Sequence, residues 1–424
     1  MSATHRPALL GAALSLAILA TACGSSGGTT SSSSAPSGAA GDKVTITWWD
    51  YFGYSPQSDQ AVNSLIQKYE QSHPNVDIQR TAIGFADFRT KLLQAAATGK
   101  FPDIAAVDNS DIPVFASQGA LADLTSKMSA WPRKDDYLDF VVQSVQYDKK
   151  FYGVPFRSNT TALWYNKDLF KKAGIAGPPQ TWQDLRTDAK ALTSGKQSGF
   201  CFAAAPTEEG TFTFLPMIWQ AGGDVPTIGD GASVKALQFV NDLVNVDKSA
   251  PKSVLQWGQS DVGDQFGSGL CAMMVNGPWV LGSVEKGKFA WDVAPWPAGD
   301  AGTASPLGGE AWAVGKNANV DAVWQLADWL ADPANSRTEI SEGLSSIPNR
   351  KDTLDDPAWV WHPMVKAFAQ QMPSAHPRGV YGPKYAQISE AVWTMEQEVL
   401  SGAKDPQTAA DDAKAKIQPL LGTS

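Results

Sequence analysis

Histidine and cysteine are scarce in this chain of 424 residues, which has four of the first and three of the second. The histidines beyond residue 23 are His73, His362 and His376, each followed by a proline. None forms a zinc-binding spacing with a cysteine or another histidine. The sequence also lacks a Walker A motif, and no G-x-G-x-x-G follows a strand-like segment. These absences argue against metal, nucleotide and dinucleotide chemistry, and no cofactor is expected.

Basic residues are in the minority. The chain holds 34 lysines and arginines against 43 aspartates and glutamates, which gives a formal net charge of −9. Nucleic acids and anionic lipids attract proteins that carry an excess of positive charge. The balance therefore disfavours both as main partners.

The apolar run near the N-terminus is too short to span a bilayer. It covers residues 8–20, thirteen in all, whereas a membrane helix needs about 20. Such a run after a weakly basic start is typical of a signal peptide, assigned here to residues 1–23. Ala20-Thr21-Ala22-Cys23 resembles a bacterial lipobox, although that motif usually has Leu where Ala20 stands. We expect Cys23 to be lipidated; the alternative is plain secretion, with Cys23 removed.

The next segment has no large apolar residue. Residues 24–41 consist of Gly, Ser, Thr, Ala and Pro and cannot offset the entropy cost of ordering, so they are predicted to be a flexible linker. The remaining ~380 residues are too many for one ordinary core and suggest two domains.

The two later cysteines, Cys201 and Cys271, each lie in an apolar, strand-like run. In an exported protein such a pair predicts a disulfide. Closing a loop of about 70 residues would stabilise the fold by roughly 4 kcal/mol. The alternative is a pair of free, buried thiols.

Strands and helices are predicted to alternate after the linker. β-Branched and apolar runs predict strands at residues 44–50, 76–82 and 102–108, and helical periodicity predicts helices at 61–74, stopped by Pro74, and 88–97. This βαβαβ order implies a parallel sheet with ligands at its carboxyl edge. Another strand and helix alternation runs from 199 to 282. Later helices carry the apolar stripes Val323, Leu326, Ala327, Leu330 and Ile388, Val392, Met395, Val399.

One corner places a large aromatic where a strand ends. The apolar run 272–275 stops at Asn276-Gly277-Pro278, which predicts a helix cap with proline in the first turn. Trp279 then lies on that turn, beside the end of a strand, where clefts form in open sheets. Trp279 either lines such a cleft or packs the helix onto the sheet, and spacing alone leaves both possibilities open.

Carboxylates suited to catalysis are hard to find. Glu208 and Glu209 are adjacent, and on an extended chain neighbours point to opposite faces, so they cannot flank one glycosidic bond. Aromatics beside short polar groups are frequent instead, and the sequence contains 16 tryptophans. A sugar has an apolar ring face and a rim of hydroxyls, which need that mixture of side chains.

Four segments together resemble the extracellular solute-binding proteins of ABC importers, in the carbohydrate-binding group that includes maltose-binding protein. They are residues 152–175, TFTFLPMIWQAGGD, FGSGLCAMMVNGPW, and PRGVYGPKYAQISEAVWTMEQEVLSG. The resemblance covers nearly all of residues 43–420. It implies a periplasmic-binding-protein-like α/β fold of class II, in which two lobes joined by hinge crossings close over one ligand without catalysis. Lobe one would comprise 42–157 and about 307–347, and lobe two 158–306 and about 348–424.

The resemblance also implies where a ligand binds. In the family, the Trp after NGP stacks on sugar, which assigns Trp279 to the site. Asn159 stands at a hinge crossing, where maltose-binding protein has a glutamate, and this difference weakens a case for maltodextrin. For each charged residue among the implied contacts, the alternative is an ordinary solvated charge on the protein surface. The implied contacts are Asp50, Tyr51, Asp108, Asn109, Asn159, Phe212, Trp279, Gly309, Glu310, Arg378 and Tyr381.

Three readings remain. The first is a lipid-anchored binding protein, monomeric and on the outer face of the cytoplasmic membrane, that delivers a di- or oligosaccharide to an ABC permease. The second has the same role with a glycerophosphodiester such as glycerophosphocholine, whose phosphate Arg378 would pair. The third is a secreted glycan-degrading enzyme, which the lack of a carboxylate pair disfavours.

Overall fold

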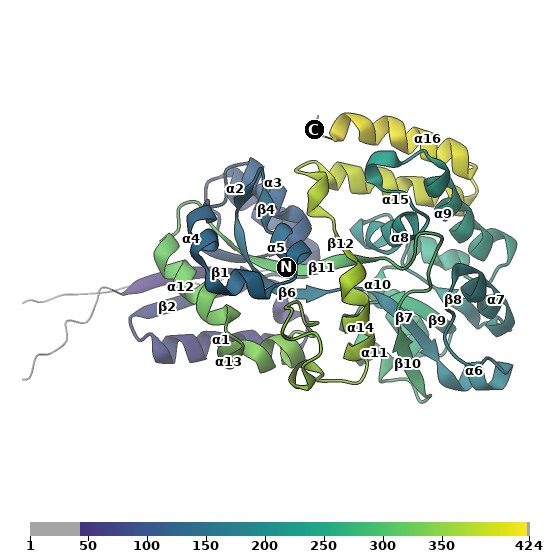
Figure 1. Ribbon diagram of the computed structural model, residues 1–424, viewed down its shortest axis with the longest axis horizontal. Helices are drawn as coiled ribbons and strands as arrows, with labels where there is room; N and C mark the ends of the chain where they lie inside the picture. Colours follow the sequence, from purple (N-terminus) through teal and green to yellow (C-terminus); the bar gives the residue numbers. More distant parts are fainter. Residues whose placement is uncertain (1–42, 422–424) are drawn as a thin grey trace, which may run out of the picture. The chain divides into compact units, whose positions relative to one another are not determined.

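The computed structural model describes residues 43–421. The predicted signal peptide, the lipidation site Cys23 and the linker at 24–41 lie outside the described residues. Two sheets organise the rest of the chain (Figure 1). No helix within 43–421 is both long enough and apolar enough to cross a membrane.

The first sheet has the strand order β12-β11-β3-β1-β2, and one more strand, β6, pairs with β11. Strands β1, β2 and β3 are parallel, as the βαβαβ pattern predicted. The long strand β11 runs antiparallel to both β3 and β6. The bounds are β1 Val44–Asp50, β2 Val76–Ala82, β3 Ile104–Asp108, β6 Gly153–Asn159, β11 Ser305–Val314 and β12 Ala375–Pro377.

The second sheet has the order β10-β7-β9-β8. Strands β8 and β9 are parallel neighbours, while β7 is antiparallel to β9 and β10. A separate two-stranded ribbon joins β4 Gln146–Tyr147 to β5 Lys150–Phe151. The bounds are β7 Ala162–Asn166, β8 Ser198–Cys201, β9 Cys271–Asn276 and β10 Trp291–Ala294.

Helices contact both sheets. Helix α1 contacts β2, α12 contacts β6 and β11, and α6, α7, α10 and α14 contact strands of the second sheet. The earlier helices are α1 Pro56–Ser72, α2 Phe85–Ala97, α3 Ile112–Ser117, α4 Thr125–Ala130, α5 Asp139–Gln143, α6 Lys167–Ala173, α7 Trp182–Leu192 and α8 Glu208–Gln220. The later helices are α9 Gly231–Asn241, α10 Gln259–Gly267, α11 Leu281–Val284, α12 Val320–Ala331, α13 Pro333–Thr338, α14 Val365–Gln371, α15 Tyr385–Ser401 and α16 Pro406–Ile417.

Helix α1 begins earlier than its apolar periodicity predicted. Ser55 and Ser58 form a capping box, and Pro56 occupies the first helical position, where its missing N–H costs nothing. The helix ends at Ser72, before the predicted stop at Pro74. The predicted apolar stripes of α12 and α15 are buried, which confirms both helices.

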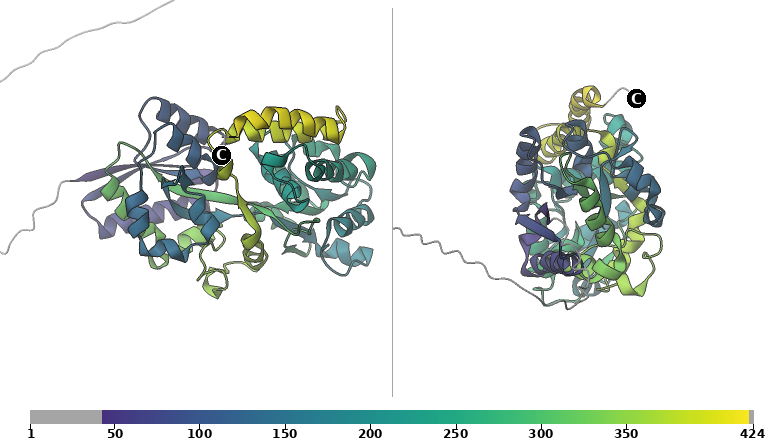
Figure 2. Two further views of the ribbon diagram at one scale, coloured as in Figure 1. Left: turned by 45° about the horizontal axis from the view of Figure 1, so that its top comes forward. Right: turned by 90° about the vertical axis from the view of Figure 1, so that its left-hand side faces the viewer.

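Short connections carry the chain from one sheet to the other. Only Thr160 and Thr161, both buried, separate β6 of the first sheet from β7 of the second. The segment 295–304 leads back from β10 to β11, and residues 372–374 link α14 to β12. Figure 2 shows β11 and β6 extending between the helices of the two parts. The chain also passes toward the second sheet between Ile347 and α14, and again between β12 and α15. The implied lobe bounds near 157, 307 and 347 stay a prediction.

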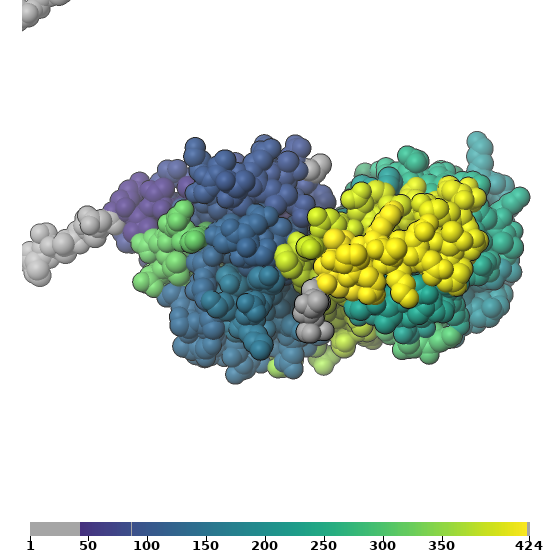
Figure 3. Space-filling view, turned by 90° about the horizontal axis from the view of Figure 1, so that it is seen from above, coloured from purple at the N-terminus to yellow at the C-terminus, as the bar shows by residue number. Residues whose placement is uncertain are grey.

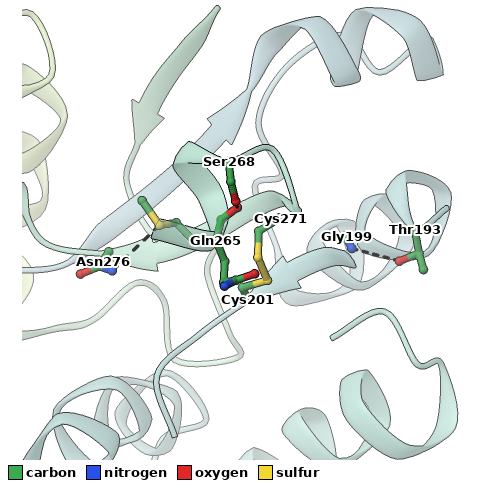
Figure 4. The surroundings of a disulfide bond; sticks show 8 residues. Thr193, Gly199, Cys201, Gln265, Ser268, Cys271 and Asn276 are labelled. Carbon is green, nitrogen blue, oxygen red and sulfur yellow. Dashed lines mark hydrogen bonds between the residues drawn. A yellow bond between two sulfur atoms is a disulfide. The ribbon is translucent and has the colours of Figure 1, made fainter. Parts of the chain in front are cut away.

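The disulfide prediction is confirmed. Cys201 ends β8 and Cys271 begins β9, and their sulfurs are bonded, with the two Cα atoms 6.0 Å apart (Figure 4). The bridge joins neighbouring parallel strands, as expected. Both cysteines are buried, so the bond lies inside the second sheet's packing.

Candidate ligand-binding site

Arg378 joins elements of the two sheets through ion pairs. Its Nη2 lies 3.1 Å from Oδ1 of Asp108, which ends β3 of the first sheet, and its Nη1 donates to Oε1 of Glu208, the first residue of α8. Its Nε donates to the carbonyl of Leu307 in β11. The guanidinium lies 4.6 Å from the ring centroid of Phe212, and only 1% of the Arg378 side chain is exposed.

The pKa of Arg378 reflects two opposed effects. Burial lowers it, but the nearby carboxylates of Asp108 and Glu208 raise it, and the net pKa is above the usual value. Arg378 is therefore a permanent cation. Because its nitrogens bond to protein atoms and its side chain is buried, a direct ion pair with a ligand would require these bonds to open. The predicted role of Arg378 as a ligand contact stays a prediction.

A second buried ion pair lies on the first sheet. Arg157 of β6 donates through Nε and Nη2 to Glu310 of β11, and through Nη1 to the carbonyl of Leu344. The hydroxyl of Tyr51 donates to the same carboxylate. Burial, followed by the charge of Glu310, raises the pKa of Tyr51 well above its usual value, so it stays a neutral donor. Tyr51 and Glu310 thus meet, as two of the predicted residues.

Asp50 has an interior position. It is fully buried, and its two oxygens accept bonds from Arg80, from the indole N–H of Trp48 and from the backbone N–H of Phe52. A buried carboxylate whose two oxygens are both hydrogen-bonded within the protein typically has a structural role. Although the sequence places Asp50 next to Tyr51, its geometry favours a role in fixing the end of β1.

Trp279 lies on the turn that follows β9, as predicted, but the turn is capped differently. The cap residue is Gly277, not Asn276, and Pro278–Val280 is a 3-10 helix. The Asn276 side chain instead accepts from the N–H of Gly277 and donates to the carbonyl of Gln259. A Cβ on Gly277 would overlap the indole ring of Trp279. Glycine is needed here because the ring folds back over it.

The Trp279 ring is partly buried and meets Phe212 of α8 edge to face, with the centroids 6.1 Å apart. Phe212 in turn covers the guanidinium of Arg378. The two predicted stacking aromatics therefore lie together, and one of them, Phe212, is on the same helix as Glu208.

Asn159 lies near the ring of Phe212, because two glycines of β11 leave room for close packing at this point. A Cβ on Gly308 would overlap the side-chain oxygen of Asn159 and touch the ring of Phe212. Gly309, whose φ is +105°, pairs with Ser158, and a Cβ there would overlap the carbonyl of Arg157. The glycine pair lets β11 approach β6 and α8 closely, so Asn159 and Phe212 are neighbours.

Asn109 and Asp111 extend the site along the 3-10 turn Asn109–Asp111 after β3. Asn109 is buried, and its Oδ1 has no hydrogen-bond partner among residues 43–421. Arg89 of α2 donates to both oxygens of Asp111. Burial, despite Arg89, raises the pKa of Asp111 to about 6.

Tyr381 differs from the other predicted contacts. Its hydroxyl donates to Asp224 and accepts from the indole N–H of Trp219, and its ring packs in the core of the second sheet's helices. Its turn, Gly379–Tyr381, nevertheless contacts the turn that holds Asn109. Figure 3 shows yellow-green residues from the late part of the chain lying between blue residues and the yellow residues of the C-terminal end.

Some residues of the site were missed from the sequence. The prediction that Glu208 and Glu209 lie on an extended chain is wrong. Thr207 caps α8, and Glu208 is the first residue of that helix. The signal was available, since Thr followed by acidic residues before an apolar run is typical of a helix N-terminus. Arg157, Arg89 and Tyr385 carried no local signal, and Tyr385 donates to Glu208.

The family model for bacterial extracellular solute-binding proteins matches residues 53–336. This chain belongs to that family. Its galactooligosaccharide-binding relative from Bacillus subtilis is 24% identical over 422 residues, which cover 96% of this chain and 94% of that protein.

Two solved structures share the fold. The GacH receptor of Streptomyces glaucescens, solved unliganded and in complex with acarbose, is 29% identical with a TM-score of 0.79, over 89% of this chain and 98% of that one. An ABC transporter solute-binding protein from Thermotoga lettingae, bound with α-D-tagatose, is 27% identical with a TM-score of 0.79, over 90% and 100%. The two-lobe α/β fold class is thereby confirmed.

In this solute-binding protein each sheet is the centre of one lobe. The residues gathered above come from both lobes: Tyr51, Asp108 and Glu310 from the first, and Glu208, Phe212 and Trp279 from the second. Arg378 holds the two groups together.

Proposed function

We propose that this protein captures a di- or oligosaccharide outside the cytoplasmic membrane and delivers it to an ABC permease. The observation that carries the proposal is a chain of contacts: Trp279 meets Phe212, Phe212 packs on the guanidinium of Arg378, and Arg378 pairs with the carboxylates of Asp108 and Glu208. Aromatic faces stack on sugar rings, and carboxylates accept bonds from sugar hydroxyls. Saccharide ligands named for the relatives support the same class.

The protein acts by binding and has no catalytic role in this proposal. Glu208 is bonded to Arg378, Tyr385 and Ser389, and Glu209 accepts from the backbone of Gln259. The two carboxylates thus serve separate contacts and do not form the pair that a glycosidase needs. A ligand is expected to leave the site unchanged.

A thermal-shift screen of saccharides and glycerophosphodiesters tests the proposal. A ligand at 100 times its Kd adds about 2.7 kcal/mol to stability. We expect shifts with saccharides and, after incubation, recovery of the same saccharide by chromatography. Cleavage of any hit would overturn the binding role, and a screen in which only glycerophosphocholine shifts the melting would replace the sugar with the phosphodiester.

We also propose a lipid anchor at Cys23 and a monomeric chain on the outer face of the cytoplasmic membrane. The lobe bounds near 157, 307 and 347 also belong to this proposal. Metabolic labelling with a fatty-acid analogue tests the anchor: wild type should be labelled and membrane-bound, while Cys23→Ala should be neither. Equal labelling of both would rule out Cys23 as the acceptor.

A further inference from the structure

Every arginine that the site presents is already paired with a carboxylate. Arg378 is shared by Asp108 and Glu208, Arg157 is held by Glu310, and Arg89 is held by Asp111. Three guanidinium groups thus face four carboxylates, which leaves the site with one excess negative charge. Arg378 and Arg157 are also buried. The site therefore offers a ligand little free positive charge.

The carboxylates of the Arg378 bridge are more open than the arginine itself. The side chain of Asp108 is 34% exposed and that of Glu208 is 42% exposed, against 1% for Arg378. Asp108 Oδ1 also accepts from Ser110, and Glu208 also accepts from Tyr385 at Oε1 and from Ser389 at Oε2. Each carboxylate oxygen has more than one lone pair, so Oδ2 of Asp108 and Oε2 of Glu208 can still accept a hydrogen bond from a ligand while the bonds to Arg378 stay in place.

These carboxylates accept hydrogen bonds and cannot donate them. A hydroxyl or ammonium group satisfies them, whereas a phosphate or carboxylate on the ligand would meet like charge. Repulsion of this kind commonly sets specificity because it penalises the wrong ligand. Arg89, the one half-exposed cation of the three, is neutralised by both oxygens of Asp111.

We propose that Glu208 and Asp108 give the site a charge selectivity, so that it accepts neutral or amino sugars and rejects uronic acids, sugar phosphates and phosphodiesters. This inference rests on the proposed function and narrows its ligand class. Glu208 is the specificity-determining residue on the second lobe, and Asp108 is its counterpart on the first. Arg378 is a positioning residue that holds the two carboxylates near each other.

The test compares neutral saccharides with matched anions by calorimetry. The probes are maltotriose and galactotriose, the derivative of each in which one C6 hydroxymethyl is oxidised to a carboxylate, and glycerophosphocholine. For wild type we expect the oxidised sugars to bind at least ten times more weakly than their parents, and glycerophosphocholine not to bind.

Glu208→Gln should reduce this discrimination at least tenfold, because Asp108 alone then balances Arg378 and the cluster changes from a net charge of −1 to neutral. Glu209→Gln is the matched control. It makes the same change in net charge one residue away, but its carboxylate bonds to the N–H of Gln259 and not to Arg378. The control should keep the wild-type ratio of affinity for the parent sugar to affinity for the oxidised sugar. A smaller affinity ratio in both variants would mean that net charge acts at long range, and would overturn the assignment to Glu208.

Salt provides a second measurement on the wild-type protein, which decides the question if Glu208→Gln does not fold. Raising ionic strength screens repulsion, so the oxidised sugars should gain affinity relative to their parents. Oxidised sugars that bind as tightly as their parents at low salt would overturn the charge selectivity alone. If no saccharide of either kind is bound in the screen, the proposed function itself fails.

Discussion

The rings of Phe212 and Trp279 meet edge to face, with their centroids 6.1 Å apart, although 67 positions separate them in the chain. Phe212 belongs to α8, and Trp279 to the turn after β9. Phe212 is buried against Arg378, whereas Trp279 is only partly buried. The pair therefore presents Trp279 as the ring that remains available to a ligand.

Trp279→Ala should cost binding more than folding. Loss of a stacking ring should weaken saccharide affinity by ~1 to 3 kcal/mol, and because the ring is partly buried the melting temperature should fall by only a few degrees. Calorimetry and thermal melts of the same preparation give both numbers. A variant that melts far lower, as a loss of ~3 to 5 kcal/mol for a core residue would produce, yet binds normally in the cold would make Trp279 structural.

Gly277→Ala should displace the same ring without removing it. The φ of Gly277 is −93°, which alanine adopts without strain, but its Cβ would overlap the Trp279 indole. We expect a saccharide affinity at least about fivefold weaker and a changed tryptophan emission. Gly282→Ala is the control, because a Cβ at Gly282 meets no atom within 4 Å. Equal affinities for all three proteins would contradict the importance of the ring position.

Reduction of the Cys201–Cys271 bond should destabilise the protein by roughly 4 kcal/mol, since the bond closes a loop of about 70 residues. Denaturant unfolding with and without a phosphine reductant measures the difference. Peptide mass spectrometry without reduction should show the two linked peptides in protein recovered from outside the cell. Free thiols at both positions there would refute the bond.

Glu396→Gln should stabilise the protein at neutral pH. Glu396 of α15 is fully buried, and neither of its carboxylate oxygens has a partner among residues 43–421. Burial raises its pKa well above the usual value. Its favourable contribution is thus complete below the unfolded pKa of about 4.3 and is lost as pH rises through the folded pKa.

Wild type should therefore lose stability relative to Glu396→Gln as pH rises above about 4.3. Chemical unfolding across a pH series measures the gap, which is the difference in free energy of unfolding between the two proteins. Glu398→Gln, two residues along the same helix, is the control: Glu398 pairs with Lys404, so its loss should not stabilise. A gap for Glu396→Gln that is constant with pH would show that the carboxyl does not titrate as proposed.

Local patterns predicted the elements well and the contacts between them poorly. The strand at 44–50 and the buried stripe of α12 follow from alternation and helical periodicity, which depend on neighbouring residues only. The bridge from Arg378 to Asp108 joins residues 270 positions apart. Nothing near either residue in the sequence signals its partner.

The family resemblance supplied part of what periodicity could not. It assigned Trp279, Phe212 and Asp108 to one site; Phe212 and Asp108 contact Arg378, and Trp279 contacts Phe212. It could not show that Asp50 is saturated by Arg80, because that depends on the side chain crossing between β1 and β2. Saturation of a charge is a property of packing, and it appears only when all partners are placed.

The strand order of the first sheet also governs the order in which the chain can fold. The first sheet begins with β1 at Val44 but is not complete until β12 at Ala375–Pro377 has been synthesised. Its central pairing of β3 with β11 spans about 200 residues, and such distant pairings form slowly. A nascent chain therefore keeps an unfinished first lobe almost to the end of translation.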